Sequence, residues 1–219
     1  MSYKLIAIDM DGTLITSDKK ITERSIRAMQ NALLSISAYT PELAQSIRDD
    51  EDACDHYEDI LGTYLVKLSA RKLGENESEE ATELLKSIGD FERISDHAVN
   101  ILGSAEELRD KKLSFSDSAK GEFETLANAL REILALSLRA FSTGDIAVAS
   151  EVEPLEQVID LLKEQMRTRH ILRMQQGNCS IEAGFVWSDL LTNLERTSDH
   201  CSNIAGCIID TAQHNLNLH

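Results

Sequence analysis

Two nine-residue stretches decide the fold of this chain. Residues 92–100 read Glu-Arg-Ile-Ser-Asp-His-Ala-Val-Asn, and residues 195–203 read Glu-Arg-Thr-Ser-Asp-His-Cys-Ser-Asn. Six of the nine positions are identical, and apolar residues at helical spacing flank both copies. A near-identical segment that returns 103 residues later indicates two copies of one structural unit.

A second pair of segments supports the duplication. Glu51 is followed by Asp55 and Glu156 by Asp160, and these two pairs are 105 residues apart. An insertion of two residues, which we place near Pro154, accounts for the difference between the two offsets. The sequence therefore predicts two copies of a three-helix unit.

The composition favours long helices, because only two prolines and ten glycines interrupt a chain in which 42% of the residues are hydrophobic. We expect an all-α fold of tandem three-helix bundles with six helices, preceded by a short strand-like segment. The first helix is expected from about Thr22, a helix start is expected at Thr40-Pro41-Glu42, and Pro154 should bend a helix that begins at Asp145. The expected units are residues 1–22, 23–112 and 113–213, followed by a tail at residues 214–219.

The charge balance excludes several kinds of partner. Asp and Glu outnumber Lys and Arg by 38 to 22, so a formal charge of −16 should repel nucleic acid and anionic lipid. No run of eighteen apolar residues predicts a membrane span, and the start of the chain does not resemble a signal peptide. The four cysteines form no Cys-x-x-Cys pair, which favours a reduced, cytoplasmic environment.

The acidic pairs are candidate metal ligands. On a helix, side chains at positions i and i+4 lie on one face, about 6 Å apart, so two carboxylates can bind one cation or bridge two. Oxygen ligands suit Mg, Ca, Mn or Fe, and nearby histidines would favour transition metals if they turned inward. The predicted metal ligands are Glu51, Asp55, Glu92, Asp96, Glu156, Asp160, Glu195 and Asp199.

A solvated acidic helix face is the alternative interpretation, because many such pairs arise by chance in a chain this acidic. Recurrence at matched positions favours a metal site, as does the cost of about 0.2 to 0.5 kcal/mol that each like-charge pair carries on an exposed helix. We expect Arg93 and Arg196 to pair with carboxylates of neighbouring helices. His97 and His200 are expected to cap or to support the ligands indirectly.

Both nine-residue stretches resemble the duplicated Glu-x-x-x-Asp signature of PhoU proteins, and are particularly similar to the PhoU-type domain of bacterial sodium/phosphate cotransporters. The similarity covers about residues 28–210. It implies six helices, multinuclear sites for ions such as Fe, Zn, Mn, Mg or Ca, and a homodimer. It also implies restraint of phosphate uptake or of the phosphate-starvation response, through contact with a phosphate transporter or its sensor kinase and without catalysis.

The start of the chain suggests a different activity. Residues 3–14 read Tyr-Lys-Leu-Ile-Ala-Ile-Asp-Met-Asp-Gly-Thr-Leu, which resembles the first motif of haloacid-dehalogenase-type phosphatases. In that family the position of Asp9 is the nucleophile and that of Asp11 the general acid/base. No later strands follow to supply the remaining residues of such a site, so we interpret residues 1–22 as a truncated fragment and expect no enzyme activity. The alternatives are a Mg-dependent phosphatase and a cotransporter regulatory domain detached from its membrane part.

Overall fold

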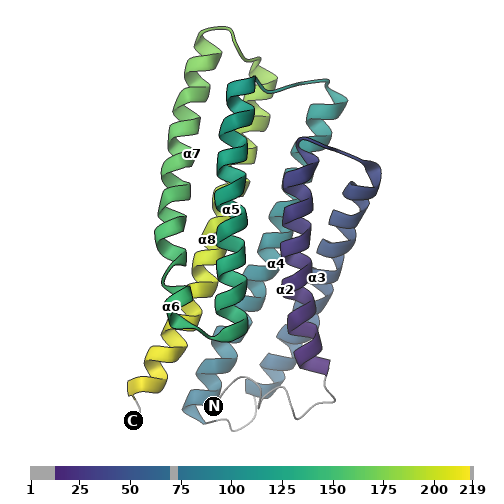
Figure 1. Cartoon of the computed structure of the whole chain (residues 1–219). Helices are drawn as coiled ribbons and strands as arrows, with labels where there is room; N and C mark the ends of the chain where they lie inside the picture. Colours follow the sequence, from purple (N-terminus) through teal and green to yellow (C-terminus); the bar gives the residue numbers. More distant parts are fainter. Residues whose placement is uncertain (1–12, 70–73, 218–219) are drawn as a thin grey trace.

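The structure, a computed structural model, describes residues 13–69 and 74–217, which fold into six long helices and one short helix (Figure 1). The expected all-α fold with six main helices is confirmed. The predicted strand, with Asp9 and Asp11, lies outside the described residues. The helices are α2 (Thr13–Ser35), α3 (Pro41–Ser69), α4 (Glu75–Asp110), α5 (Asp117–Thr143), α6 (Ile146–Ala149), α7 (Val152–Gln175) and α8 (Ile181–Asn217).

The helices form two bundles that lie side by side. Helices α2, α3 and α4 pack together in the first bundle, and α5, α7 and α8 in the second, with short α6 linking α5 to α7 (Figure 1). The bundles meet mainly along α4 and α8, which share the most extensive contact of any helix pair. Because α4 and α8 carry the duplicated nine-residue stretches, the repeated sequence lies at the centre of the molecule.

Local sequence explains where the helices begin. The hydroxyl of Thr40 accepts a hydrogen bond from the backbone N–H of Leu43 at 3.1 Å, and Pro41 is the first residue of α3. Ser116 and Ser180 cap α5 and α8 in the same manner, at 3.3 and 3.1 Å. The expected start at Thr40-Pro41-Glu42 is therefore confirmed, whereas α2 begins at Thr13, earlier than expected.

The expected bend at Pro154 is wrong. The chain instead breaks after the short helix α6, and α7 starts at Val152, so that Pro154 lies in its first turn. A proline there interrupts no hydrogen bond, because the first N–H groups of a helix have no partner within it. The last helix also continues to Asn217, beyond the fraying that the polar residues after Asp210 predict.

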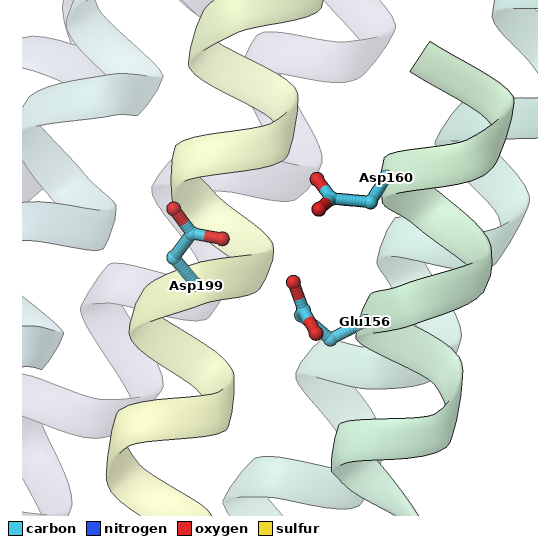
Figure 2. Close-up of side chains that lie close together, drawn as sticks. All are labelled: Glu156, Asp160 and Asp199. Carbon is cyan, nitrogen blue, oxygen red and sulfur yellow. The ribbon is translucent and has the colours of Figure 1, made fainter. Parts of the chain in front are cut away.

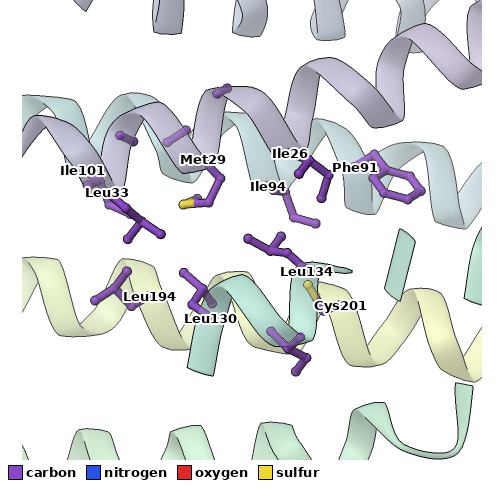
Figure 3. Packing of buried hydrophobic residues seen from close by; sticks show 14 of the residues in the cluster. Ile26, Met29, Leu33, Phe91, Ile94, Ile101, Leu130, Leu134, Leu194 and Cys201 are labelled. Carbon is purple, nitrogen blue, oxygen red and sulfur yellow. The ribbon is translucent and has the colours of Figure 1, made fainter. Parts of the chain in front are cut away.

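One hydrophobic core joins the two bundles (Figure 3). Met29 and Ile94 of the first bundle face Leu130 and Leu134 of the second, and all four are fully buried. Each buried side chain of this size contributes about 1.5 to 3 kcal/mol. The bundles are therefore expected to depend on each other for stability.

Trp187, most of the phenylalanines and most of the cysteines belong to the core. Trp187 is buried, and its ring makes an edge contact with Phe115. Three of the four cysteines are buried, and Cys179 is half-buried. Phe185 is the exception, since 68% of it is exposed near the start of α8.

None of the helices in residues 13–69 and 74–217 is long and apolar enough to cross a membrane.

Candidate metal centres in the two repeats

The eight predicted ligands lie on two pairs of neighbouring helices, one pair in each bundle. Helices α3 and α4 carry the four carboxylates of the first repeat, and α7 and α8 carry those of the second. In each repeat a Glu-x-x-x-Asp pair of one helix therefore has a counterpart on the next.

Three carboxylates of the second repeat converge. Glu156 and Asp160 of α7 point toward Asp199 of α8 (Figure 2), and one carboxylate oxygen from each lies within 4.8 Å of the others. Two of these residues are half-buried and one is exposed. Within the described ranges no other group of three potential metal ligands comes this close together.

The fourth predicted ligand of this repeat has a different partner. The carboxylate of Glu195 forms an ion pair with the ammonium group of Lys163, which lies 2.7 Å away on α7. Both side chains are 20% exposed. Lys163 was not among the residues that the sequence singled out.

The charges in the second repeat oppose one another when no cation is present. Burial raises the pKa of Glu156, and the charges of Asp160 and Asp199 raise it further. The pKa of Asp199 is also raised, first by burial and then by Glu195 and Asp160. A bound cation would stabilise the ionised form of these carboxylates.

In the first repeat, too, neighbouring carboxylates repel one another. Burial raises the pKa of Glu51, and the charges of Asp52, of Asp96 across on α4 and of Asp55 raise it further. The pKa of Glu92 is raised to about 7 by burial and by Asp96, with a smaller contribution from Glu58.

Arg93 partly compensates the negative charge of the first repeat. Its guanidinium lies 3.6 Å from both Glu92 and Asp96, with 63% of the side chain exposed. These partners are on its own helix, so the expected pairing with a neighbouring helix is wrong for Arg93. Arg196, its counterpart in the second repeat, is exposed.

The histidines of the two repeats have hydrogen-bond partners outside the eight predicted ligands. Nδ1 of His97 lies 2.9 Å from the side-chain oxygen of Asn193, and Nδ1 of His200 lies 2.8 Å from a carboxylate oxygen of Asp90. Asp90 and Asn193 occupy equivalent positions of the two repeats, and the two imidazole rings stack at 5.4 Å. These histidines therefore link α4 to α8 between the bundles. Their indirect support of the metal ligands stays a prediction.

The donor set limits the ions that would fit. With the histidines engaged between the bundles, the facing groups in each repeat are carboxylates. Hard cations such as Mg, Ca, Mn and Fe match oxygen ligands of this kind better than ions that prefer nitrogen or sulfur.

Sequence reasoning missed Glu58 and Lys163. Each follows the Asp of its pair by three residues, at the same position of the two repeats. Extending the Glu-x-x-x-Asp pattern by one turn in both copies would have revealed them.

The fold and these facing carboxylates define a duplicated helical-bundle protein with one acidic centre in each repeat. The sequence profile of the PhoU domain matches residues 19–105 and 123–208, one match for each repeat. The chain therefore belongs to the PhoU family.

Individual proteins of known description agree with this assignment. The chain is 24% identical over 199 residues to the phosphate-specific transport system accessory protein PhoU homolog 1 of Thermotoga maritima, covering 90% of this chain and 85% of that protein. Its fold is similar to that of PhoU from Pseudomonas aeruginosa, with a TM-score of 0.82, 20% identity and coverage of 97% and 100% of the two chains. The phosphate transport system regulatory protein PhoU from Streptococcus pneumoniae gives a TM-score of 0.79, with 18% identity and coverage of 92% and 96%.

Proposed function

We propose that this chain regulates phosphate transport as an accessory protein that acts by contact with other proteins. The match of the PhoU domain to both repeats carries the proposal, and the description of the Thermotoga maritima relative supports it. A phosphate transporter or its sensor kinase is the expected partner, and a homodimer is the expected assembly. The large negative charge favours a partner with a basic surface.

The alternatives gain no comparable support. The phosphatase interpretation depends on Asp9 and Asp11, which precede the first PhoU match at residue 19 and lie outside the described residues. The interpretation as a cotransporter domain has less support, because the matched Thermotoga maritima relative is described as an accessory protein of a transport system.

Deletion of the gene tests the regulatory role. Cells without this chain should take up phosphate without restraint, or express phosphate-starvation genes when phosphate is plentiful. Uptake of labelled phosphate and a starvation-gene reporter measure these outcomes, and the restored gene is the control. Unchanged uptake and reporter activity after deletion would reject the proposal.

Metal binding by the two acidic centres is the second part of the proposal. The convergence of Glu156, Asp160 and Asp199 supports it, as do the raised pKa values in both repeats. We expect Glu156→Gln combined with Asp199→Asn to lower the metal that co-purifies with the protein, with helicity unchanged. Elemental analysis measures the metal, and Glu164→Gln, on the exposed face of the same helix, is the matched control.

A further inference from the structure

Helix α7 exposes an apolar stripe, formed by Val158, Leu161 and Leu172, on the side away from its buried residues. These side chains are 47%, 64% and 50% exposed, and their spacing places them on one face of the helix. Among the described helices, α7 contacts only α5, α6 and α8, and it lies at the outer edge of the second bundle (Figure 1). Large apolar side chains gathered on a free helix face are typical of an interaction surface.

Charged residues flank the apolar stripe in a separated pattern. Glu151 and Glu153 lie at the start of α7, Arg167 and Arg169 lie toward its end, and all four are exposed. Glu151 and Arg169 are nine residues to either side of residue 160, and Glu153 and Arg167 are seven residues to either side of it. Each acid therefore has a base at the same distance from one point on the helix.

Both arginines have only weak partners within their own chain. Arg167 lies 3.8 Å from Glu164, and both of these side chains are mostly in solvent. Arg169 lies 3.6 Å from Glu122, with 58% of the arginine side chain exposed. Ion pairs as long and as solvated as these contribute little, so both guanidinium groups remain available to a second protein.

A second copy of the chain complements this pattern. When two identical helices pack antiparallel about a two-fold axis, residues at equal distances on opposite sides of the axis face each other. With the axis at residue 160, Glu153 of each copy faces Arg167 of the other. Glu151 faces Arg169 in the same way, which gives four ion pairs across the contact. The apolar stripes of the two copies meet at the axis.

The first repeat lacks the charge pattern. Helix α3 also exposes apolar residues, with Ile60 at 46% and Val66 at 61%, so apolar exposure alone does not distinguish the two helices. At the offset of 105 residues, the positions of the four flanking charges are occupied by Ser46, Arg48, Gly62 and Tyr64. These residues cannot form the same pairs, so the charges assign the surface to α7.

We propose that two copies of this chain associate through α7, antiparallel, with the two-fold axis near residue 160. This inference rests on the homodimer proposed above and assigns the surface that forms it. The formal charge of −16 on each chain repels a second copy at a distance. Opposite charges at the contact offset this repulsion locally and fix the register of the two helices.

Reversal of the charges on each half of α7 in the full-length chain tests the inference. The first variant carries Glu151→Lys and Glu153→Lys, and the second carries Arg167→Glu and Arg169→Glu. Each variant alone places like charges opposite each other, so its dimer dissociation constant should rise about tenfold or more. A 1:1 mixture places opposite charges together again and should restore the dimer, a result that misfolding of either variant cannot produce. Sedimentation velocity measures the dimer fraction.

Matched substitutions elsewhere in the chain are the controls. Lys111→Glu with Lys112→Glu, both exposed between the bundles, changes the net charge as much as the second variant does and should leave the dimer unchanged. Leu161→Gln should raise the dissociation constant about tenfold, whereas Val66→Gln on α3, at a residue of similar exposure, should not. Circular dichroism confirms that each variant keeps its helices, and Arg167→Glu alone replaces the second variant if the double substitution does not.

Three results would contradict the inference, and they fall on different parts of it. A dimer that forms equally well in every α7 variant overturns the assignment to α7 and leaves the homodimer standing, with another protein as the occupant of the stripe. Variants that stay monomeric in the 1:1 mixture overturn the antiparallel register. An unmutated chain that is monomeric at every concentration overturns the homodimer, and the inference with it.

Discussion

The surroundings of Glu92 oppose the negative charge of its carboxylate. Burial and Asp96 raise its pKa to about 7, so in the metal-free protein it holds a proton between the unfolded value of 4.5 and about pH 7, where an unfolded glutamate is ionised. A raised pKa in the folded state contributes stability that is present below the unfolded value of 4.5 and is lost as the pH rises through 7.

We predict that the metal-free protein is more stable near pH 5.5 than near pH 8, and that Glu92→Gln reduces this dependence. Thermal unfolding in the presence of a chelator, followed by circular dichroism, measures both effects. Addition of Mn²⁺ should restore stability at pH 8 in the unmutated chain, because a cation replaces the proton as the compensating charge. The same pH dependence in Glu92→Gln as in the unmutated chain would show that another group is responsible.

The contact between α4 and α8 brings the two copies of the repeated sequence together. His97 and His200 exchange hydrogen bonds with Asn193 and Asp90 across this contact, in a pattern that follows the repeat. The sequence identified the histidines, but their partners could not be predicted, because the crossing of two helices from different repeats depends on how the bundles dock. The helices themselves were predictable, since caps and apolar spacing are local signals.

Asp90→Ala should destabilise this contact by about 1 to 3 kcal/mol, because it leaves Nδ1 of half-buried His200 without its acceptor. Asp90→Asn should cost less, since Asn193 already provides an amide oxygen to His97 at the equivalent position. Urea unfolding of the three proteins measures the difference. Equal stability of Asp90→Ala and Asp90→Asn would mean that the hydrogen bond contributes nothing.

The close approach of α7 and α8 depends on Gly184. A Cβ atom at this position would lie 2.9 Å from both Nε2 of His170 and Sδ of Met174, and His170 is buried. Gly184→Ala should therefore destabilise the protein by about 1 to 3 kcal/mol through overpacking.

Gly206→Ala is the matched control on the same helix, because its Cβ would meet nothing within 4 Å. This change should stabilise the protein by about 0.5 to 1 kcal/mol, since alanine favours a helix interior over glycine. Urea unfolding of both variants measures the contrast. A stable Gly184→Ala protein would show that Met174 and His170 move aside at little cost.

At the scale of the whole molecule, the sequence predicted the duplication and the facing acidic helices, but not how the charges within each centre are compensated. The pairs beginning at Glu51 and Glu156 were predicted from spacing and from the family resemblance. The structure places them on helices that pack against those of Glu92 and Glu195. The ion pair between Lys163 and Glu195 depends on where the two side chains lie in space, which the sequence pattern does not give. A repeat pattern describes each unit but not how the two units dock, so it could not predict the core between the bundles.

That shared core predicts that the two repeats unfold together. Leu61 is buried in α3 of the first bundle, whereas the single tryptophan, Trp187, is buried in α8 of the second. We expect Leu61→Ala to destabilise the protein by about 2 to 5 kcal/mol. It should also shift the urea transition of Trp187 fluorescence together with that of far-UV circular dichroism, because loss of the first bundle exposes the face of the second that Met29 and Ile94 cover. If Trp187 fluorescence kept its original midpoint while the circular dichroism transition split in two, the bundles would be independent folding units, and the apolar contact between them would add little to the stability of either.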